Sequence, residues 1–188
     1  MLSGTSRVSA LFLVTGFEPF GEHERNSSWE ALALLRHSWP GDIVTRRLPV
    51  DYLAAHEQLR RELDALEPVA VLCTGLAQGS VFRVERRARR PLALPEEAGT
   101  TEALGRWPWQ EMHAALQSSG VQSVDSENAG QYVCESTYWS LLNHSRGQYS
   151  APFAAFLHVP PESLEHPIEQ IARAIGAVVD SRYRHLSQ

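Results

Sequence analysis

Short apolar runs alternate with helical patterns along almost the whole chain, and this alternation is the feature that most constrains the fold. The runs that predict strands lie at 8–14, 43–50, 69–74, 80–88, 121–126 and 153–159. The patterns that predict helices lie at 27–37, 51–66, 109–119, 131–144 and 167–184. Strands that alternate with helices indicate an α/β fold, a three-layer α/β/α sandwich with a mostly parallel central sheet. In such sheets, functional side chains are expected beyond the carboxyl ends of the strands.

Local signals refine these elements. Ser27, followed three residues later by Glu30, is typical of a capping box that opens the first helix, and Asp51 is expected to cap the second. The run at 69–74 is continuously apolar, as in a strand buried on both faces. Prolines and glycines interrupt 91–106, so we expect a loop there.

Size and charge limit the classes of protein that this chain can belong to. Its 188 residues, 43% of them hydrophobic, suffice for one core, so we expect a single domain over 1–188. The net charge of −5 argues against a general nucleic-acid binder. All 17 basic residues are arginine. A chain without lysine cannot use a P-loop lysine, a Schiff-base lysine or a serine–lysine pair.

The two cysteines, Cys73 and Cys134, do not suggest a disulfide framework, because a domain of this size has a core of its own. We therefore expect reduced thiols and a cytoplasmic protein. The apolar segment at 10–14 is too short to cross a membrane. The HEQLR motif at 56–60 lacks the second histidine of a metalloprotease helix, so neither a metal nor a cofactor is expected.

Three residues near predicted strand or helix ends combine into a candidate catalytic site. Cys134 lies in the first turn or so of a predicted helix, where the helix dipole is expected to lower the thiol pKa. His158 ends an apolar strand, and Glu85 is a carboxylate that could orient its ring. Taken singly, each of these residues has a common structural explanation, because free cysteines are usually buried.

Four separated motifs make the chain resemble the pyroglutamyl peptidase I family of cysteine peptidases. They are LVTGFEPFGEHERNSSWEAL, VLCTGLAQGSVFRVERRA, ENAGQYVCESTYWSLL and AFLHVPPE, within residues 8–161. The resemblance implies a catalytic triad of Glu85, Cys134 and His158, the residues that the strand-end argument selects. It also implies removal of N-terminal pyroglutamate through an acyl-enzyme, with peptides that carry this residue as substrates.

The resemblance also implies residues that contact the substrate. They are Phe17, Phe20, Asn26, Tyr132 and Val133. Phenylalanines in a loop rich in glycine and proline suit the wall of a pocket for a flat, neutral lactam. Backbone N–H groups at the start of the 131–144 helix are the expected oxyanion donors. Relatives commonly form homotetramers, which allows for a homo-oligomer here.

Two alternatives remain open, the first because of departures from the family pattern. Ser80 stands after Gly79, where relatives commonly have an arginine whose charge Arg83 could replace only by reaching from elsewhere. The stretch at 91–106 is shortened, and Glu135 follows the nucleophile in place of asparagine. The first alternative is a catalytically impaired relative that binds a lactam or a peptide N-terminus. The second is an RNA- or phosphate-binding patch formed by RVERRARR at 83–90.

Overall fold

The computed structural model of the protein describes residues 11–21, 24–39, 42–91, 101–130, 132–144, 146 and 151–186. Its helices are α1 (Ser27–Ser38), α2 (Tyr52–Leu66), α3 (Trp109–Ser118), α4 (Val133–His144) and α5 (Ile168–Leu186). Its strands are β1 (Phe12–Phe17), β2 (Ile43–Leu48), β3 (Ala70–Leu76), β4 (Phe82–Glu85), β5 (Arg87–Arg89), β6 (Glu102–Leu104), β7 (Ser123–Ser126) and β8 (Phe153–Val159).

The central sheet has the strand order β2-β1-β3-β8-β4-β7. Strands β2, β1, β3 and β8 are parallel to one another, β4 is antiparallel to β8, and β7 is parallel to β4. This arrangement confirms the mostly parallel sheet. It also places β8, the last strand in the sequence, between the two groups of earlier strands.

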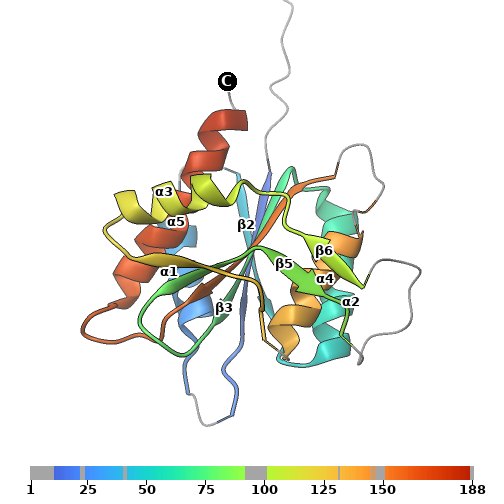
Figure 1. Ribbon diagram of the computed structural model, residues 1–188, viewed down its shortest axis with the longest axis horizontal. Coiled ribbons are helices and arrows are strands. Elements are labelled where there is room, and N and C mark those ends of the chain that lie inside the picture. The colour runs from blue at the N-terminus through green and yellow to red at the C-terminus, as the bar shows by residue number, and fades with distance from the viewer. Residues whose placement is uncertain are drawn as a thin grey trace, which may run out of the picture.

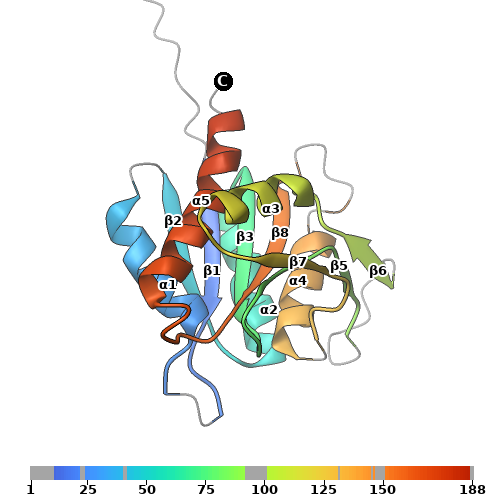
Figure 2. The ribbon, with the colours of Figure 1, turned by 60° about the vertical axis from the view of Figure 1, so that its left-hand side comes forward.

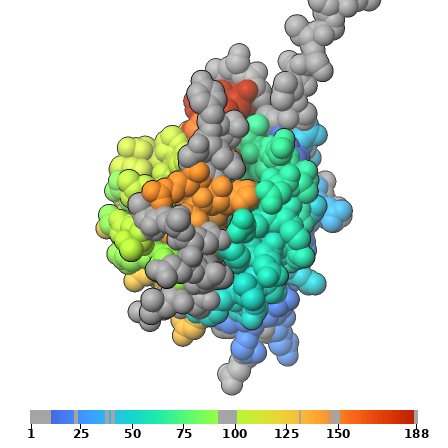
Figure 3. All heavy atoms as spheres, turned by 90° about the vertical axis from the view of Figure 1, so that its right-hand side faces the viewer, coloured from blue at the N-terminus to red at the C-terminus, as the bar shows by residue number. Residues whose placement is uncertain are grey.

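Helices cover both faces of the sheet, which confirms the three-layer α/β/α architecture (Figures 1 and 2). Helices α1, α3 and α5 pack on one face, and α2 and α4 pack together on the other. In Figure 3 the residues of α2 form a continuous teal surface on their side of the molecule.

Each face has its own apolar core. Side chains from α1, α3 and α5 form the first core, with Phe12 and Val14 contributed by the sheet. The second core contains residues of α2 and α4 together with Leu13 and Phe17 of β1. Successive residues of a strand point to opposite faces, so β1 supplies both cores from one apolar run.

Several predicted boundaries differ from the structure, and the differences are largest at three places. The predicted strand 80–88 is two strands, β4 and β5, because β5 leaves the central sheet and pairs with β6 instead. The end of the predicted loop 91–106 therefore contains strand β6, while 92–100 lies outside the described residues. Strand β1 continues through Phe17, three residues beyond the predicted end, because Thr15 to Phe17 pair in register with β2. Residues 8–10, where that strand was predicted to begin, also lie outside the described range.

The helix caps are correct for α2 and wrong by one residue for α1. Asp51 caps α2, and its Oδ1 accepts a hydrogen bond from the backbone N–H of Ala54 at 2.8 Å. In α1 the cap is Asn26 rather than Ser27, because the Asn26 side chain accepts the backbone N–H of Ser28. The Ser27 hydroxyl instead accepts a hydrogen bond from the backbone N–H of Glu162.

Candidate active site

The alternation of side chains along β4 and β8 places Glu85 and His158 on the same face of the sheet. Phe82 and Val84 of β4 lie in the core beneath α3 and α5, so Glu85 points to the opposite face, toward α4. In β8, Leu157 lies in that same core, so His158 also points toward α4. Strands β4 and β8 are antiparallel neighbours in the sheet, so Glu85 and His158 lie on adjacent strands.

Glu85 and His158 form a buried hydrogen-bonded pair. The Oε1 atom of Glu85 lies 2.7 Å from Nδ1 of His158, and the exposed fractions of the two side chains are 0% and 7%. A carboxylate at Nδ1 holds the proton on that nitrogen and leaves Nε2 free to accept another. This is the orientation that a general base needs.

Cys134 lies next to this pair. Its sulfur lies over Gly75, a residue without a side chain to fill that space. Its Sγ packs against Gly75 of β3, where an added Cβ would lie 2.9 Å from the sulfur and 3.0 Å from the Phe156 ring. Gly75 is the register partner of His158, so the thiol lies one strand away from the imidazole, on the same face. The sequence motifs include Gly75, but its role depends on this packing and is not evident without it.

The environment of Cys134 raises the pKa of its thiol to about 12, chiefly through burial and then through the negative charge of Glu85. The predicted lowering by the helix dipole is therefore wrong, because desolvation in this half-buried position outweighs the partial charge of the helix end. The thiol is neutral in the resting protein. It must give up its proton to a base during any reaction.

Cys73 is a core residue. It is fully buried in the cluster beneath α2 and α4, and burial raises the pKa of its thiol to about 12. Both cysteines are free.

Tyr138 holds the backbone of Glu85, and Gly105 leaves room for the Tyr138 hydroxyl. The Tyr138 hydroxyl donates a hydrogen bond of 3.0 Å to the backbone carbonyl of Glu85. A Cβ at Gly105 would lie 2.3 Å from that hydroxyl oxygen, so only glycine fits there. Sequence reasoning missed this contact, since it joins three segments that are far apart in the chain.

Asn26 organises the first loop. Its Oδ1 accepts hydrogen bonds from the backbone N–H and the hydroxyl of Ser28, and its Nδ2 donates to the carbonyl of Glu18. The Ser28 hydroxyl in turn accepts the backbone N–H of Phe17 at 3.1 Å. The side chain is 1% exposed, so it acts here by fixing the shape of the loop.

The remaining predicted pocket residues lie at different depths. Phe17 and Val133 belong to the buried cluster against which Cys134 packs. Phe20 is 39% exposed and Tyr132 is 76% exposed. Val133 thus adjoins Cys134 in the chain and Phe17 lies in the same cluster, whereas Phe20 and Tyr132 present aromatic surface to the solvent.

The two departures from the family pattern occupy defined positions. Arg83 lies opposite His158 in the β4–β8 register, and its Nη2 donates a hydrogen bond of 2.5 Å to the carbonyl of Gln78. Its guanidinium therefore stands beside the loop that contains Gly79. Glu135 is 6% exposed, and its Oε1 accepts the backbone N–H of Arg89. Burial raises the pKa of the Glu135 carboxyl group.

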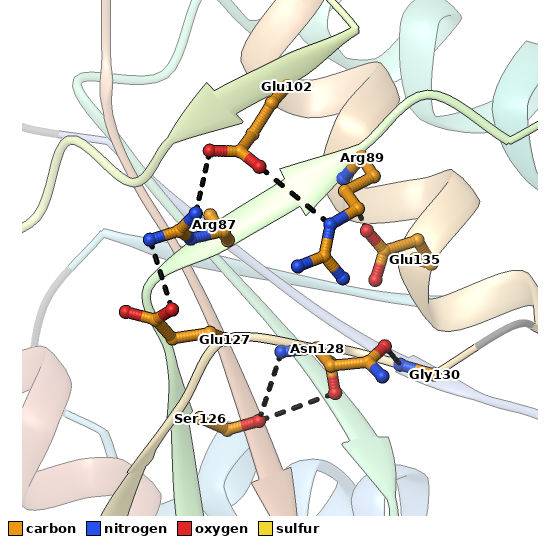
Figure 4. A network of polar contacts seen from close by, with 8 residues as sticks. All are labelled: Arg87, Arg89, Glu102, Ser126, Glu127, Asn128, Gly130 and Glu135. Atoms are coloured by element: carbon orange, nitrogen blue, oxygen red, sulfur yellow. Dashed lines mark hydrogen bonds and ion pairs between the residues drawn. The ribbon is translucent and has the colours of Figure 1, made fainter.

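The arginine-rich run makes ion pairs within the protein. Arg87 pairs with Glu102 and Glu127 (Figure 4). Arg86 lies 3.7 Å from Asp125 and stacks over the Trp109 ring at 4.4 Å from its centroid. These partners neutralise much of the charge that the RNA-binding alternative requires.

Within the described ranges, no group of histidine, cysteine, aspartate and glutamate side chains could hold a metal ion. A search of the same residues finds no helix that combines the length and the apolar character needed to cross a membrane.

Comparison with known proteins gives consistent results. The sequence profile of the family described as "Pyroglutamyl peptidase" matches residues 10–92 and 93–177. The pyrrolidone-carboxylate peptidase of Clavibacter michiganensis subsp. michiganensis is 31% identical, over 89% of this chain and 90% of its own.

Solved structures agree in fold. The pyrrolidone carboxyl peptidase from Thermococcus litoralis superposes with a TM-score of 0.83 at 25% identity, covering 94% of each chain. The pyrrolidone carboxyl peptidase from Thermus thermophilus has a TM-score of 0.79 at 30% identity and covers 91% of this chain and 100% of its own.

Proposed function

Because the chain belongs to the pyroglutamyl peptidase family, we propose that it is a cysteine peptidase that removes an N-terminal pyroglutamyl (5-oxoproline) residue from peptides. The observation that carries the proposal is the buried Glu85–His158 hydrogen bond beside a thiol at the start of a helix. In this proposal Cys134 is the nucleophile, His158 is the general base and Glu85 orients the imidazole.

Acylation begins from a neutral thiol, because the pKa of Cys134 is about 12. His158 Nε2 takes the thiol proton while Sγ attacks the carbonyl carbon between pyroglutamate and the next residue. The carbonyl electron pair moves onto oxygen, and the first backbone N–H groups of α4 stabilise this oxyanion. The intermediate collapses with cleavage of the C–N bond, and the imidazolium gives its proton to the departing amine.

Deacylation repeats these steps with water. His158 takes a proton from a water molecule as its oxygen attacks the thioester, and the tetrahedral intermediate expels Sγ. The sulfur regains a proton, and free pyroglutamate leaves. The Glu85 side chain stabilises the imidazolium that forms in each half of the reaction. The chemistry requires no cofactor.

The lactam ring is proposed to lie against Phe17 and Val133, with Phe20 and Tyr132 closing over it from the solvent side. Apolar walls suit a neutral ring without a free amine, which needs a few hydrogen bonds and no counter-charge. Asn26 contributes by holding the loop that carries both phenylalanines. The charge of Arg83 stands at the rim of the same site, in register with His158.

The direct test is release of a reporter amine from a pyroglutamyl amide. Cys134→Ala is expected to remove this activity, a loss on the order of 10³-fold or more, because no nucleophile remains. Cys73→Ala is the matched control, since it also removes a thiol but leaves the site intact. It is expected to retain activity and to lower stability by about 1 kcal/mol through a small cavity.

Two results would exclude this mechanism. The first is activity that survives Cys134→Ala. The second is a folded wild-type protein that binds pyroglutamate or a pyroglutamyl peptide without releasing product, which would identify the catalytically impaired relative. A nucleophilic thiol needs reducing conditions, so the cytoplasm is the proposed site of action.

A further inference from the structure

A network of polar contacts connects the β5–β6 hairpin to the segment that leads into α4 (Figure 4). Arg87 of β5 holds Glu102 of β6 at 2.8 Å and Glu127 at 3.0 Å. Asn128 closes a turn in the same segment, because its Oδ1 accepts the backbone N–H of Gly130 at 3.0 Å. The hairpin is thus fixed to the chain that precedes the nucleophile.

Glu135 extends this network to the helix itself. It is the acidic residue in the first turn of α4, and its carboxylate turns toward β5, where it accepts the backbone N–H of Arg89 (Figure 4). Its second oxygen, Oε2, is buried and makes no hydrogen bond of good geometry among the described residues, although the backbone N–H of Ala129, like that of Arg89, favours the charged form of the carboxyl group. A carboxylate is costly to bury in this way, and its pKa is raised accordingly. An uncharged side chain at this position would avoid that cost.

We propose that Glu135 is a positioning residue for the nucleophile: its hydrogen bond to the backbone of β5 holds the first turn of α4 so that the Cys134 sulfur lies over Gly75, within reach of His158. Cys134 is the adjacent residue, and its sulfur lies in the space over Gly75, where an added Cβ would meet both the sulfur and the Phe156 ring. A small rotation or shift of this turn would move the sulfur out of that space. The proposal rests on the proposed function, and it gives a role in that function to Glu135, a residue that departs from the family pattern.

The charge of Glu135 has an opposite, smaller effect. The carboxylate contributes to the raised pKa of the Cys134 thiol, although less than burial and Glu85 do. If Glu135 acted mainly through its charge, removing the charge would help the reaction. If Glu135 acts through the hydrogen bond, the reaction depends on the length of its side chain and not on its charge.

Two substitutions separate reach from charge. Glu135→Gln keeps the length and a carbonyl acceptor but removes the charge, whereas Glu135→Asp keeps the charge and shortens the side chain by one carbon. Glu169, the exposed acidic residue in the first turn of α5, provides the matched controls Glu169→Gln and Glu169→Asp. These controls account for any general effect of a charge near a helix N-terminus.

The measurements are kcat and KM for a pyroglutamyl amide, and the rate at which iodoacetamide alkylates Cys134, located by peptide mass mapping. Glu135→Asp is expected to lower kcat by about 10-fold or more with KM within about threefold, because a misplaced nucleophile affects the chemical step. Glu135→Gln and both Glu169 variants are expected to stay within about threefold of wild type.

The proposal is overturned if Glu135→Asp has the kcat of wild type, or if Glu135→Gln loses as much as Glu135→Asp. Circular dichroism and thermal unfolding establish that each variant is folded. Alkylation of Cys134 reports on the position and environment of the thiol even without turnover, so an inactive wild type would contradict the proposed function and still leave this inference open to measurement. Equal alkylation rates in wild type and Glu135→Asp would then overturn it.

Discussion

At the residue scale, burial decides the chemistry of the thiol. Cys134 stands at a helix start, which favours a thiolate, yet its surroundings raise its pKa to about 12. In the proposed mechanism the thiol therefore depends on a base that acts during attack, and the hydrogen bond to Glu85 holds His158 in the orientation for this role. The glutamate has two effects of opposite sign, because it supports the imidazolium and disfavours the thiolate.

Glu85→Gln should separate these two effects. Turnover is expected to fall on the order of 10²- to 10⁴-fold, since an amide cannot stabilise the imidazolium. The thiol pKa is expected to fall as well, because a nearby negative charge is removed. Alkylation of Cys134 at a fixed pH below 10 should then become faster while turnover becomes slower. A loss of both rates together would contradict this account.

Gly75→Ala tests the space that holds the sulfur. The new methyl group would lie 2.9 Å from Cys134 Sγ, and the Phe156 ring and the β3 backbone limit its movement. We expect kcat/KM to fall by about 100-fold or more, because small displacements of a reacting atom are costly. The urea midpoint of unfolding should change modestly by comparison. Wild-type activity in this variant would mean that the thiol does not react from the observed position.

At the scale of the elements, the α1 cap and the first loop of the site depend on one side chain. Asn26→Ala removes the cap and leaves the backbone groups of Glu18 and Ser28 without their partner. We expect a loss of about 1–2 kcal/mol in unfolding free energy and a raised KM, because the loop with Phe17 and Phe20 loses its support.

Asp51→Ala provides the comparison for that substitution. Asp51 caps α2 in the same way, but it is exposed and its side chain bonds the backbone N–H of Ala54 rather than a group of the first loop. It should cost about 1 kcal/mol without changing KM. If both variants raise KM equally, the effect reflects general loosening and not the shape of the loop.

The elements also show where sequence reasoning succeeds. Continuous apolar runs identified β3 and β8, and helical patterns identified all five helices, because burial on one or both faces leaves a local signature. The hairpin β5–β6 left no such signature. Half of its strand residues are charged, and its partners Glu127 and Glu135 lie about forty residues along the chain.

At the scale of the whole molecule, the arginine run illustrates the same limit. Five arginines at 83–90 suggest a basic patch, but folding brings Asp125, Glu102 and Glu127 to them. For the candidate site the sequence was a better guide. The strand ends and the family resemblance both predict Glu85 and His158. Their contact, and the fit of Cys134 over Gly75, depend on the packed sheet.

The neutralised run predicts weak or no nucleic-acid binding. With a net charge of −5, the protein is expected to cause no mobility shift of a short RNA at low salt. A shift that weakens steeply as salt increases would contradict this expectation. Pre-incubation with RNA should also leave peptidase activity unchanged.

The strand order has a consequence for the time at which a newly made chain gains activity. Strands β2, β1 and β3 form one group and β4 and β7 another, and only β8 joins them. Because β8 begins at Phe153 and carries His158, the two groups cannot close into one sheet until β8 has been synthesised. A truncated chain that ends before β8 lacks both the general base and the strand that unites its sheet. Within the described part of the chain, β8 thus unites the central sheet and completes the candidate active site in the same step.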